Sequence, residues 1–268
     1  MPNLKLLSLN VKGLNSPFKR KALWNDALKF GCDILCIQES HFARDNPPQF
    51  SHPKFPHIFA SHNSKKKKGV LTIIKDSISF QLLDSKIDQQ GRYVILVAKI
   101  ENTILTLVNI YAPNRNPQQF LQKVITITKK IQKGNIILCG DFNATMDPTL
   151  DTTKGIQSKR RGLKNIFSQE DLHDPWRCLH ATEKDFTFYS NVHKSYSRID
   201  FFITDRALLQ KTTDAHIHNI TWSDHAPISL IIDLAQQNSK HVLWRNNTYI
   251  LSHRGALAEM KERLEEFV

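Results

Sequence analysis

The sequence predicts an α/β fold, a sandwich of mixed sheets with helices on its outer faces. Short apolar segments recur along the 268 residues and are bounded by Gly, Asn or Asp, as strands commonly are. Longer amphipathic segments fall between some of them, which predicts helices that connect strands. Segments 91–100 and 103–111 are separated by only two residues, which predicts an antiparallel hairpin. A hairpin beside strand–helix–strand units indicates mixed sheets rather than a purely parallel fold.

Nine strands and three helices are predicted in chain order. The strand segments are 4–11, 32–39, 69–75, 91–100, 103–111, 135–142, 185–190, 198–204 and 226–234. The helical segments are 17–30, 117–132 and 161–171. The first helix is preceded by Ser16, a residue type that caps helices, and begins with Pro17 at the first helical position. The second repeats apolar residues at helical spacing, which predicts one face packed against a sheet.

The chain is divided by composition into a domain at 1–237 and a C-terminal tail or linker at 238–268. The last part, from Ala256, is rich in Ala, Glu, Leu and Lys and lacks the strand alternation seen before it. The tail is expected to lead toward a downstream region. Because Lys and Arg number 37 against 25 Asp and Glu, the net charge is +12, which favours a polyanionic partner, nucleic acid first. A basic, merely solvated surface is the alternative.

The cysteines and the N-terminus point to a reducing compartment. None of the four cysteines forms a paired CxxC spacing, which argues against a zinc site. The N-terminus has no charged segment leading into an apolar one, so no secretion signal is expected. No apolar run approaches the ~20 residues that a membrane span needs, so no membrane partner is expected.

Polar side chains stand where several predicted strands end. Since open α/β sheets bind ligands at one end of their strands, these side chains are expected to line one cleft. Each has an ordinary alternative, because Asp and Asn often begin turns, a histidine is often a surface residue and a tyrosine can be a packing anchor. Their recurrence at strand ends favours a site. They are Asn10, Glu39, Tyr111, Asp141, Asn143, Asp200, Asp224 and His225.

This set of side chains suits a magnesium-dependent phosphodiester hydrolase. Carboxylate oxygens are the ligands Mg²⁺ prefers, and Glu39 is the expected main ligand. His225 could donate to a phosphate oxygen while Asp200 accepts from its other ring nitrogen. Asp141 could orient or deprotonate a water, with Asn143 holding that water or the phosphate. The hydroxyl of Tyr111 could stabilise developing charge, so metal-assisted hydrolysis is the expected reaction.

Six short motifs match, in order, those of the exonuclease–endonuclease–phosphatase family, whose fold resembles DNase I. Within it, LNVKGLNSPFKRKALW, CIQESHF, LDTTKG and FTFYSNVHKSYSRID are most similar to the endonuclease domain of LINE-type (non-LTR) retrotransposon proteins. WRNN at 244–247 resembles the segment that follows that domain. The six motifs are LNVKGLN (9–15), IQES (37–40), NIYAPN (109–114), GDFN (140–143), SRID (197–200) and SDH (223–225).

The resemblance implies a two-sheet α/β sandwich of DNase I-like type, and it implies a reaction. The reaction is Mg²⁺-dependent nicking of one strand of double-stranded target DNA, with Mn²⁺ able to substitute, leaving a 3′-hydroxyl that primes reverse transcription. The implied partners are the DNA target, the downstream reverse transcriptase region of the same polyprotein and the element RNA. The protein would be made in the cytoplasm and act in the nucleus.

The resemblance also assigns roles residue by residue. It implies Asn10 and Glu39 at the metal and Tyr111 near the phosphate. One departure is Lys12, where many relatives carry an acid; since lysine cannot ligate Mg²⁺, a second metal there is not expected, and Lys12 would contact phosphate or be solvated. The remaining assignments are Asp141 and Asn143 at the nucleophilic water, Asp200 paired with His225, Asp224 beside them, and Thr187 and Ser197 at DNA.

The segment FYSNVHKSYS (188–197) is predicted to be a hairpin that enters a DNA groove, because aromatic and basic side chains there can read DNA shape. An ordinary connecting loop is the alternative. The run SKKKK (64–68) could contact phosphate, serve as a nuclear address or be solvated. The predicted DNA contacts are Asn114, Arg115, Thr187, Tyr189, His193, Lys194, Tyr196, Ser197 and Arg198, with Arg44, Lys159, Arg160 and Arg161 as further phosphate contacts.

Three other functions share parts of this pattern. An abasic-site repair endonuclease has the same core and differs in substrate. A phosphatase of small phosphates overlaps in motifs, but the charge of +12 and the hairpin favour DNA. A catalytically inert DNA-binding module would not need its full set of acids and histidine.

Overall fold

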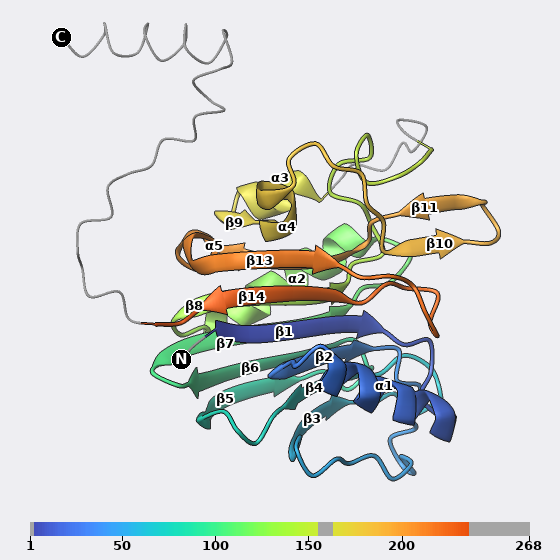
Figure 1. Cartoon of the computed structure of the whole chain (residues 1–268), viewed down its shortest axis with the longest axis vertical. Coiled ribbons are helices and arrows are strands. Elements are labelled where there is room, and N and C mark those ends of the chain that lie inside the picture. The colour runs from blue at the N-terminus through green and yellow to red at the C-terminus, as the bar shows by residue number, and fades with distance from the viewer. Residues whose placement is uncertain (1–2, 155–162, 236–268) are drawn as a thin grey trace, which may run out of the picture. The chain divides into compact units, whose positions relative to one another are not determined.

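The computed structural model describes residues 3–154 and 163–235, which form two six-stranded sheets packed against each other (Figure 1). In spatial order the first sheet contains β13 (Thr212–Ile217), β14 (Ile228–Asp233), β1 (Asn3–Asn10), β2 (Ile34–Gln38), β4 (Val70–Ile74) and β3 (His57–Ser61). The second contains β5 (Phe80–Ile87), β6 (Tyr93–Ile100), β7 (Thr103–Tyr111), β8 (Asn135–Asp141), β12 (Asp200–Asp205) and β9 (Leu172–His173). The pairs β1–β2 and β7–β8 are parallel and the other neighbours antiparallel, so both sheets are mixed.

A separate two-stranded hairpin, β10 (Phe188–Ser190) and β11 (Ser195–Ser197), projects from the sandwich, at the right in Figure 1. The helices are α1 (Pro17–Lys29), α2 (Pro117–Ile131), α3 (Lys164–Ser168), α4 (Pro175–Leu179) and α5 (Arg206–Lys211). The longest two cover opposite outer faces, because α1 shares a core with the first sheet and α2 with the second. The predicted sandwich with helices outside is therefore confirmed.

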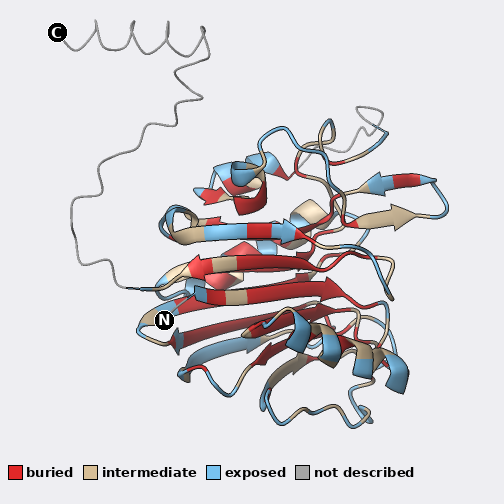
Figure 2. Ribbon diagram, viewed as in Figure 1, coloured by how far each residue is buried: buried red, intermediate tan, exposed pale blue. Residues whose placement is uncertain are grey.

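The central strands are apolar on both faces, and Figure 2 shows them buried along most of their length. In β1, Leu6 packs between the two sheets, whereas Leu7 packs toward α1. In β7, Leu107 faces the space between the sheets and Val108 faces α2. Because neither face meets water, these strands read in the sequence as continuous apolar runs rather than as alternating ones.

The strands that the sequence pattern missed are β3, β5, β9 and β13, which lie at the four sheet edges. An edge strand is open to solvent on one side, so it needs fewer apolar residues. In β5 the six residues between Phe80 and Ile87 are exposed. No strong apolar run exists there to be recognised.

The helices match the prediction in part. The predicted helix 117–132 corresponds to α2 almost residue for residue. Pro17 opens α1 as predicted, but the Ser16 side chain makes no capping hydrogen bond. Of the predicted helix 161–171, the described residues 163–171 contain α3, and the short α4 and α5 were not predicted. Each of these two is capped by an aspartate, Asp174 or Asp205, in a bond of a kind that contributes about 1 kcal/mol.

Some predictions fall outside the described residues. They concern Lys159, Arg160, Arg161, the WRNN motif and the domain boundary at 237, so the division into 1–237 and 238–268 stays a prediction. Within 3–154 and 163–235, the helices are all too short or too polar to cross a bilayer.

Candidate active site

The register of three neighbouring strands brings Asp141, Asp200 and Tyr111 together. In the β8–β12 pair, Asp141 lies directly opposite Asp200, and in the β7–β8 pair it lies beside Tyr111. Gly140, just before Asp141, has φ +125°, and a Cβ at this position would lie 2.1 Å from the carbonyl oxygen of Ile110. Only glycine tolerates both the conformation and the contact. Glycine lets the parallel strands β7 and β8 approach each other. The sequence GD therefore places an acid at the end of β8.

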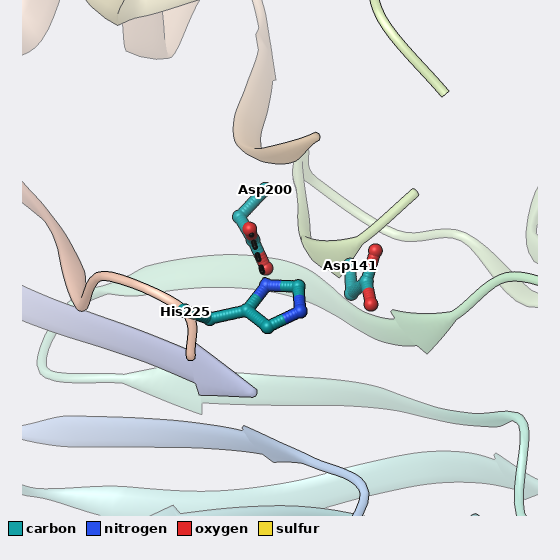
Figure 3. Close-up of side chains that lie close together, drawn as sticks. All are labelled: Asp141, Asp200 and His225. Atoms are coloured by element: carbon teal, nitrogen blue, oxygen red, sulfur yellow. Dashed lines mark hydrogen bonds and ion pairs between the residues drawn. The ribbon is translucent and has the colours of Figure 1, made fainter. Parts of the chain in front are cut away.

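Asp200 and His225 form a buried pair, drawn in Figure 3. The Nδ1 of His225 lies 2.8 Å from Oδ2 of Asp200, and the two side chains are 6% and 3% exposed. Burial alone would lower the pKa of His225, but the charge and hydrogen bond of Asp200 overcome it and raise the pKa to about 9. His225 is therefore a cation at neutral pH, with its other ring nitrogen on the side of Asp141 (Figure 3). This is the pairing the sequence predicts.

Asp141 is the third member of this cluster and is fully buried. Burial and then the charge of Asp200 raise the pKa of Asp141 to about 7, against the lowering effects of His225, the Asn143 N–H and the Asn10 side chain. The backbone N–H of Asn143 donates to Oδ1 of Asp141 at 2.8 Å, and the Asn143 amide donates to the carbonyl of Ala112 at 2.8 Å. Both bonds anchor the turn after β8, so Asp141 and Asn143 face the same space.

Asn10 connects the two sheets across this space. Its side-chain NH₂ donates to Glu39 Oε1 and to Asp141 Oδ2, both at 2.9 Å. Its oxygen accepts the backbone N–H of Lys12 at 3.0 Å. The predicted role of Asn10 as a metal ligand does not fit this arrangement, because the amide turns its donors, not its oxygen, toward the acids. Asn10 instead holds two carboxylates in place.

Glu39 has the character expected of a cation ligand. Burial alone would raise the pKa of Glu39, but hydrogen bonds from His41, Asn10 and Tyr111 lower it to about 2. The Nε2 of His41 lies 3.0 Å from Oε2 of Glu39. Burial and the charges of Glu39 and Asp141 raise the pKa of Tyr111 well above its usual value, so its hydroxyl stays protonated. Glu39 is ionised, and Tyr111 can act only as a neutral donor.

Asp224 lies beside His225 in sequence but has a different partner. Its Oδ2 is 2.7 Å from Nζ of Lys12, and the hydrogen bond and charge of Asp224 raise the pKa of Lys12. The Ser223 hydroxyl donates to the carbonyl of Asn10 at 2.6 Å, which ties this segment to the end of β1. Lys12 is therefore neither solvated alone nor available as a metal ligand.

The donor set fits a hard divalent cation. Four carboxylates gather at this edge, and Oδ1 of Asp200 and Oδ1 of Asp224 are buried without a hydrogen-bond partner among the described residues. Asp141, Asp200 and His225 each bring a potential ligand atom within 4.8 Å of the others. Since Nδ1 of His225 is already bonded to Asp200, the carboxylate oxygens are the better ligands for an ion such as Mg²⁺. A cation would also relieve the repulsion that raises the pKa of Asp141.

Most predicted DNA contacts are reachable from solvent. Asn114 and Arg115 are exposed after β7, and His193 and Lys194 are exposed at the hairpin turn. The rings of Tyr189 and Tyr196 lie 4.6 Å apart on the hairpin, and Ser197 is half-buried at its base. Val192 at the turn is 87% exposed. Arg44 and the lysines of SKKKK are also at the surface, apart from a half-buried Lys68.

Two predicted DNA contacts do not fit the structure. Thr187 is fully buried, and its hydroxyl accepts the N–H groups of Ile199 and Asp200, both at 3.1 Å. Arg198 is 2% exposed, with Nε 2.9 Å from Asp151 and Nη1 2.7 Å from Asp174. Both residues support the strand that carries Asp200. They sit too deep to contact a ligand on the surface.

Sequence reasoning missed two residues of this edge. His41 lies two residues after Glu39 and hydrogen-bonds its carboxylate. The histidine at this spacing in the segment ESH could have been recognised in the sequence. Arg92 packs over the Tyr111 ring at 4.7 Å and donates to the carbonyls of Tyr111 and Ala112. Arg92 adds positive charge near Glu39 and Asp141. Nothing in the local sequence distinguishes Arg92 from other arginines, because only the β6–β7 register brings it there.

A family model and several known proteins match most of this chain. The model of the Endonuclease/Exonuclease/phosphatase family matches residues 7–225. The Transposon TX1 uncharacterized 149 kDa protein of Xenopus laevis is 24% identical, covering 97% of this chain and 20% of that protein. A DNA-(apurinic or apyrimidinic site) endonuclease of Dictyostelium discoideum is 27% identical, covering 86% of this chain and 71% of that protein.

Solved structures share the fold. The AP endonuclease LMAP from Leishmania major superposes with a TM-score of 0.70 at 18% identity, covering 86% of this chain and 87% of that one. An AP endonuclease from Archaeoglobus fulgidus gives a TM-score of 0.68 at 22% identity, covering 86% and 100%. This chain spans only about a fifth of the Xenopus relative but most of these smaller proteins.

Proposed function

The chain belongs to the endonuclease/exonuclease/phosphatase family, and on that premise we propose that it is a metal-dependent endonuclease that nicks one strand of double-stranded DNA. The observation that carries the proposal is the buried Asp141, Asp200 and His225 cluster beside an ionised Glu39. The hairpin β10–β11, which exposes aromatic and basic side chains, begins close to this cluster, since Phe188 in β10 pairs with His225. The chemistry and a surface for duplex DNA thus share one edge.

Each residue has one expected role. Glu39 would hold the Mg²⁺, or Mn²⁺ in its place, and the bound ion would supply Lewis-acid stabilisation of charge on the phosphate. The cationic His225, held by Asp200, donates to a phosphate oxygen. Asp141 orients the attacking water and takes its proton, while the side-chain oxygen of Asn143 accepts from that water. The neutral Tyr111 hydroxyl donates to the phosphate as charge develops.

We extend the proposal to a retrotransposon role: the nick leaves a 3′-hydroxyl that primes reverse transcription at the target. The support is the Xenopus transposon protein, which aligns with nearly all of this chain. The reverse transcriptase region of the same polyprotein and the element RNA would be partners, with action in the nucleus. The second candidate is an abasic-site endonuclease, which the names of the Dictyostelium and Leishmania relatives support.

The test is nicking of supercoiled plasmid with Mg²⁺ or with EDTA, using wild-type and Asp141→Ala protein, with the cut ends mapped by sequencing. We expect Mg²⁺-dependent open circles that carry 3′-hydroxyl ends and disappear with Asp141→Ala. An intact duplex and a matched duplex with one abasic site separate the two candidates. Cleavage of the abasic duplex alone would favour the repair enzyme, and cleavage of neither duplex would refute a DNA endonuclease.

A further inference from the structure

The turn that follows β1 places Lys12 at the catalytic edge, which is the end of the sandwich where Glu39, Asp141, Asp200 and His225 lie. Its backbone has φ +45°, and its N–H donates to the side-chain oxygen of Asn10, the residue that holds Glu39 and Asp141. The Lys12 side chain leaves this same turn and reaches Asp224, which directly precedes His225. One short turn therefore fixes both the carboxylates of the site and a lysine beside them.

The Lys12–Asp224 ion pair is more open to solvent than the Asp200–His225 pair. The Lys12 side chain is 61% exposed and that of Asp224 28%, whereas Asp200 and His225 are buried. An exposed ion pair adds little to folding stability, so stability does not explain this contact. A lysine ammonium has three donors, and the bond to Asp224 uses only one of them.

The surroundings keep this ammonium charged and aimed. Asp224 and Glu39 both attract it. Lys19 supports the turn, since its Nζ donates to the carbonyls of Val11 and Lys12 at 2.8 and 3.2 Å. The backbone of the turn is thus held by a second lysine, while the Lys12 side chain stays open to solvent.

We propose that the Lys12 ammonium, steered by Asp224, binds a non-bridging oxygen of the phosphate that is cleaved, which makes Lys12 a substrate-contacting residue of this site. The proposal rests on the proposed function. The Lys12 ammonium is bonded to Asp224, the residue next to His225, and Glu39 attracts it, so it lies beside the groups that would hold the DNA phosphate. Lysine is a natural ligand for such an oxygen, as a compact point charge.

The test compares Lys12→Met and Lys12→Arg with a matched control, Lys99→Met. Lys99 is an exposed lysine near the end of β6 away from Tyr93, so it lies far from the catalytic edge. We expect Lys12→Met to lower kcat/KM for nicking about tenfold or more, as for a lost charged hydrogen bond. The slope of log kcat/KM against log[KCl] is negative, and for Lys12→Met its magnitude should be smaller by about one, as expected when one phosphate contact is lost. Lys12→Arg should keep the wild-type slope, and Lys99→Met should match wild type.

A double-mutant cycle with Asp224→Asn separates substrate contact from simple neutralisation of Asp224. If Lys12 binds phosphate, adding Lys12→Met to Asp224→Asn should still make the salt slope shallower by about one, with a smaller loss of rate because Asp224 no longer positions the ammonium. If Lys12→Met leaves the salt slope unchanged in the Asp224→Asn background, the proposal is wrong. Thermal melting of each variant verifies folding.

Failure of the proposed function would look different. A wild-type protein that nicks no duplex would refute the endonuclease and leave Lys12 to be judged by DNA binding alone. The salt slope of Kd for duplex DNA in EDTA should then still be lower by about one for Lys12→Met than for Lys99→Met. Equal slopes in that measurement would overturn the Lys12 contact.

Discussion

The catalytic edge and the β10–β11 hairpin are neighbours in the chain but are built in opposite ways. At the catalytic edge, Asp141, Asp200 and His225 are buried, and each is hydrogen-bonded to another strand or loop. On the hairpin, Val192 is 87% and Tyr196 45% exposed. Chemistry needs fixed geometry and controlled protonation, which burial between strands supplies. Recognition of a duplex needs side chains that reach outward.

The two regions are also joined. Thr187, at the foot of the hairpin, binds the backbone of Asp200, and Phe188 lies against the His225 ring at 4.7 Å. Arg198 leaves β11 and is buried between Asp151 and Asp174, with its guanidinium over the Trp176 ring. Removing the partners of a buried cation is strongly destabilising, so Arg198 is held firmly between its two aspartates. Because Arg198 directly follows β11, these contacts fix where the hairpin leaves the sandwich. The comparison predicts that substitutions at the edge change rate and that substitutions on the hairpin change target choice.

The largest effect is expected from His225→Ala. Removing a positioned acid–base group should cut the nicking rate by at least ~10²-fold, while DNA binding is largely kept. Asp141→Ala should do the same. Single-turnover nicking and a gel-shift assay in EDTA measure the two quantities. A near-wild-type rate for either variant would show that the buried cluster is structural.

Asp200→Asn should alter the pH profile more than the maximal rate. Asp200 raises the pKa of His225 to about 9, so wild-type nicking should fall as pH rises through that value, whereas protonation of Asp141, whose pKa is raised to about 7, should lower the rate on the acid side. Without the carboxylate the pKa of His225 drops toward about 6.5, so at pH 8 the cationic fraction falls about thirtyfold, with little change at pH 6. Rates from pH 6 to 9.5 measure the shift.

Asp84→Asn, an exposed aspartate on edge strand β5, is the matched control for this profile. Its alkaline limb should coincide with that of wild type. An unmoved limb in Asp200→Asn would mean that another group sets the profile.

The smallest effect on rate is expected from Tyr196→Ala on the hairpin. Total nicking of plasmid should stay within about threefold, because Tyr196 lies outside the buried cluster, while the distribution of cut positions should change. Sequencing of the mapped 3′ ends gives that distribution. Phe18→Ala, a 72% exposed aromatic on α1, should leave it unchanged. A Tyr196→Ala map identical to wild type would remove this side chain from target choice.

The sequence alone determined the sandwich, the strands of its interior and most residues of the candidate site. The interior strands are recognisable because both faces are buried, and runs such as IILC before Gly140 carry that signal locally. The residues Glu39, Asp141, Asp200 and His225 are recognisable because each lies at a strand or loop end within a short motif. The edge strands escaped because solvent on one side removes the apolar run.

Only the tertiary structure decided which residues touch. The amide orientation of Asn10 depends on the Lys12 N–H and on carboxylates 29 and 131 positions away. The burial of Thr187 and Arg198, the approach of Arg92 to Tyr111 and the pairing of Lys12 with Asp224 follow from how strands of the two sheets and their loops meet. Local sequence encodes propensity and pattern, whereas hydrogen-bond partners and pKa values depend on neighbours that only packing brings together.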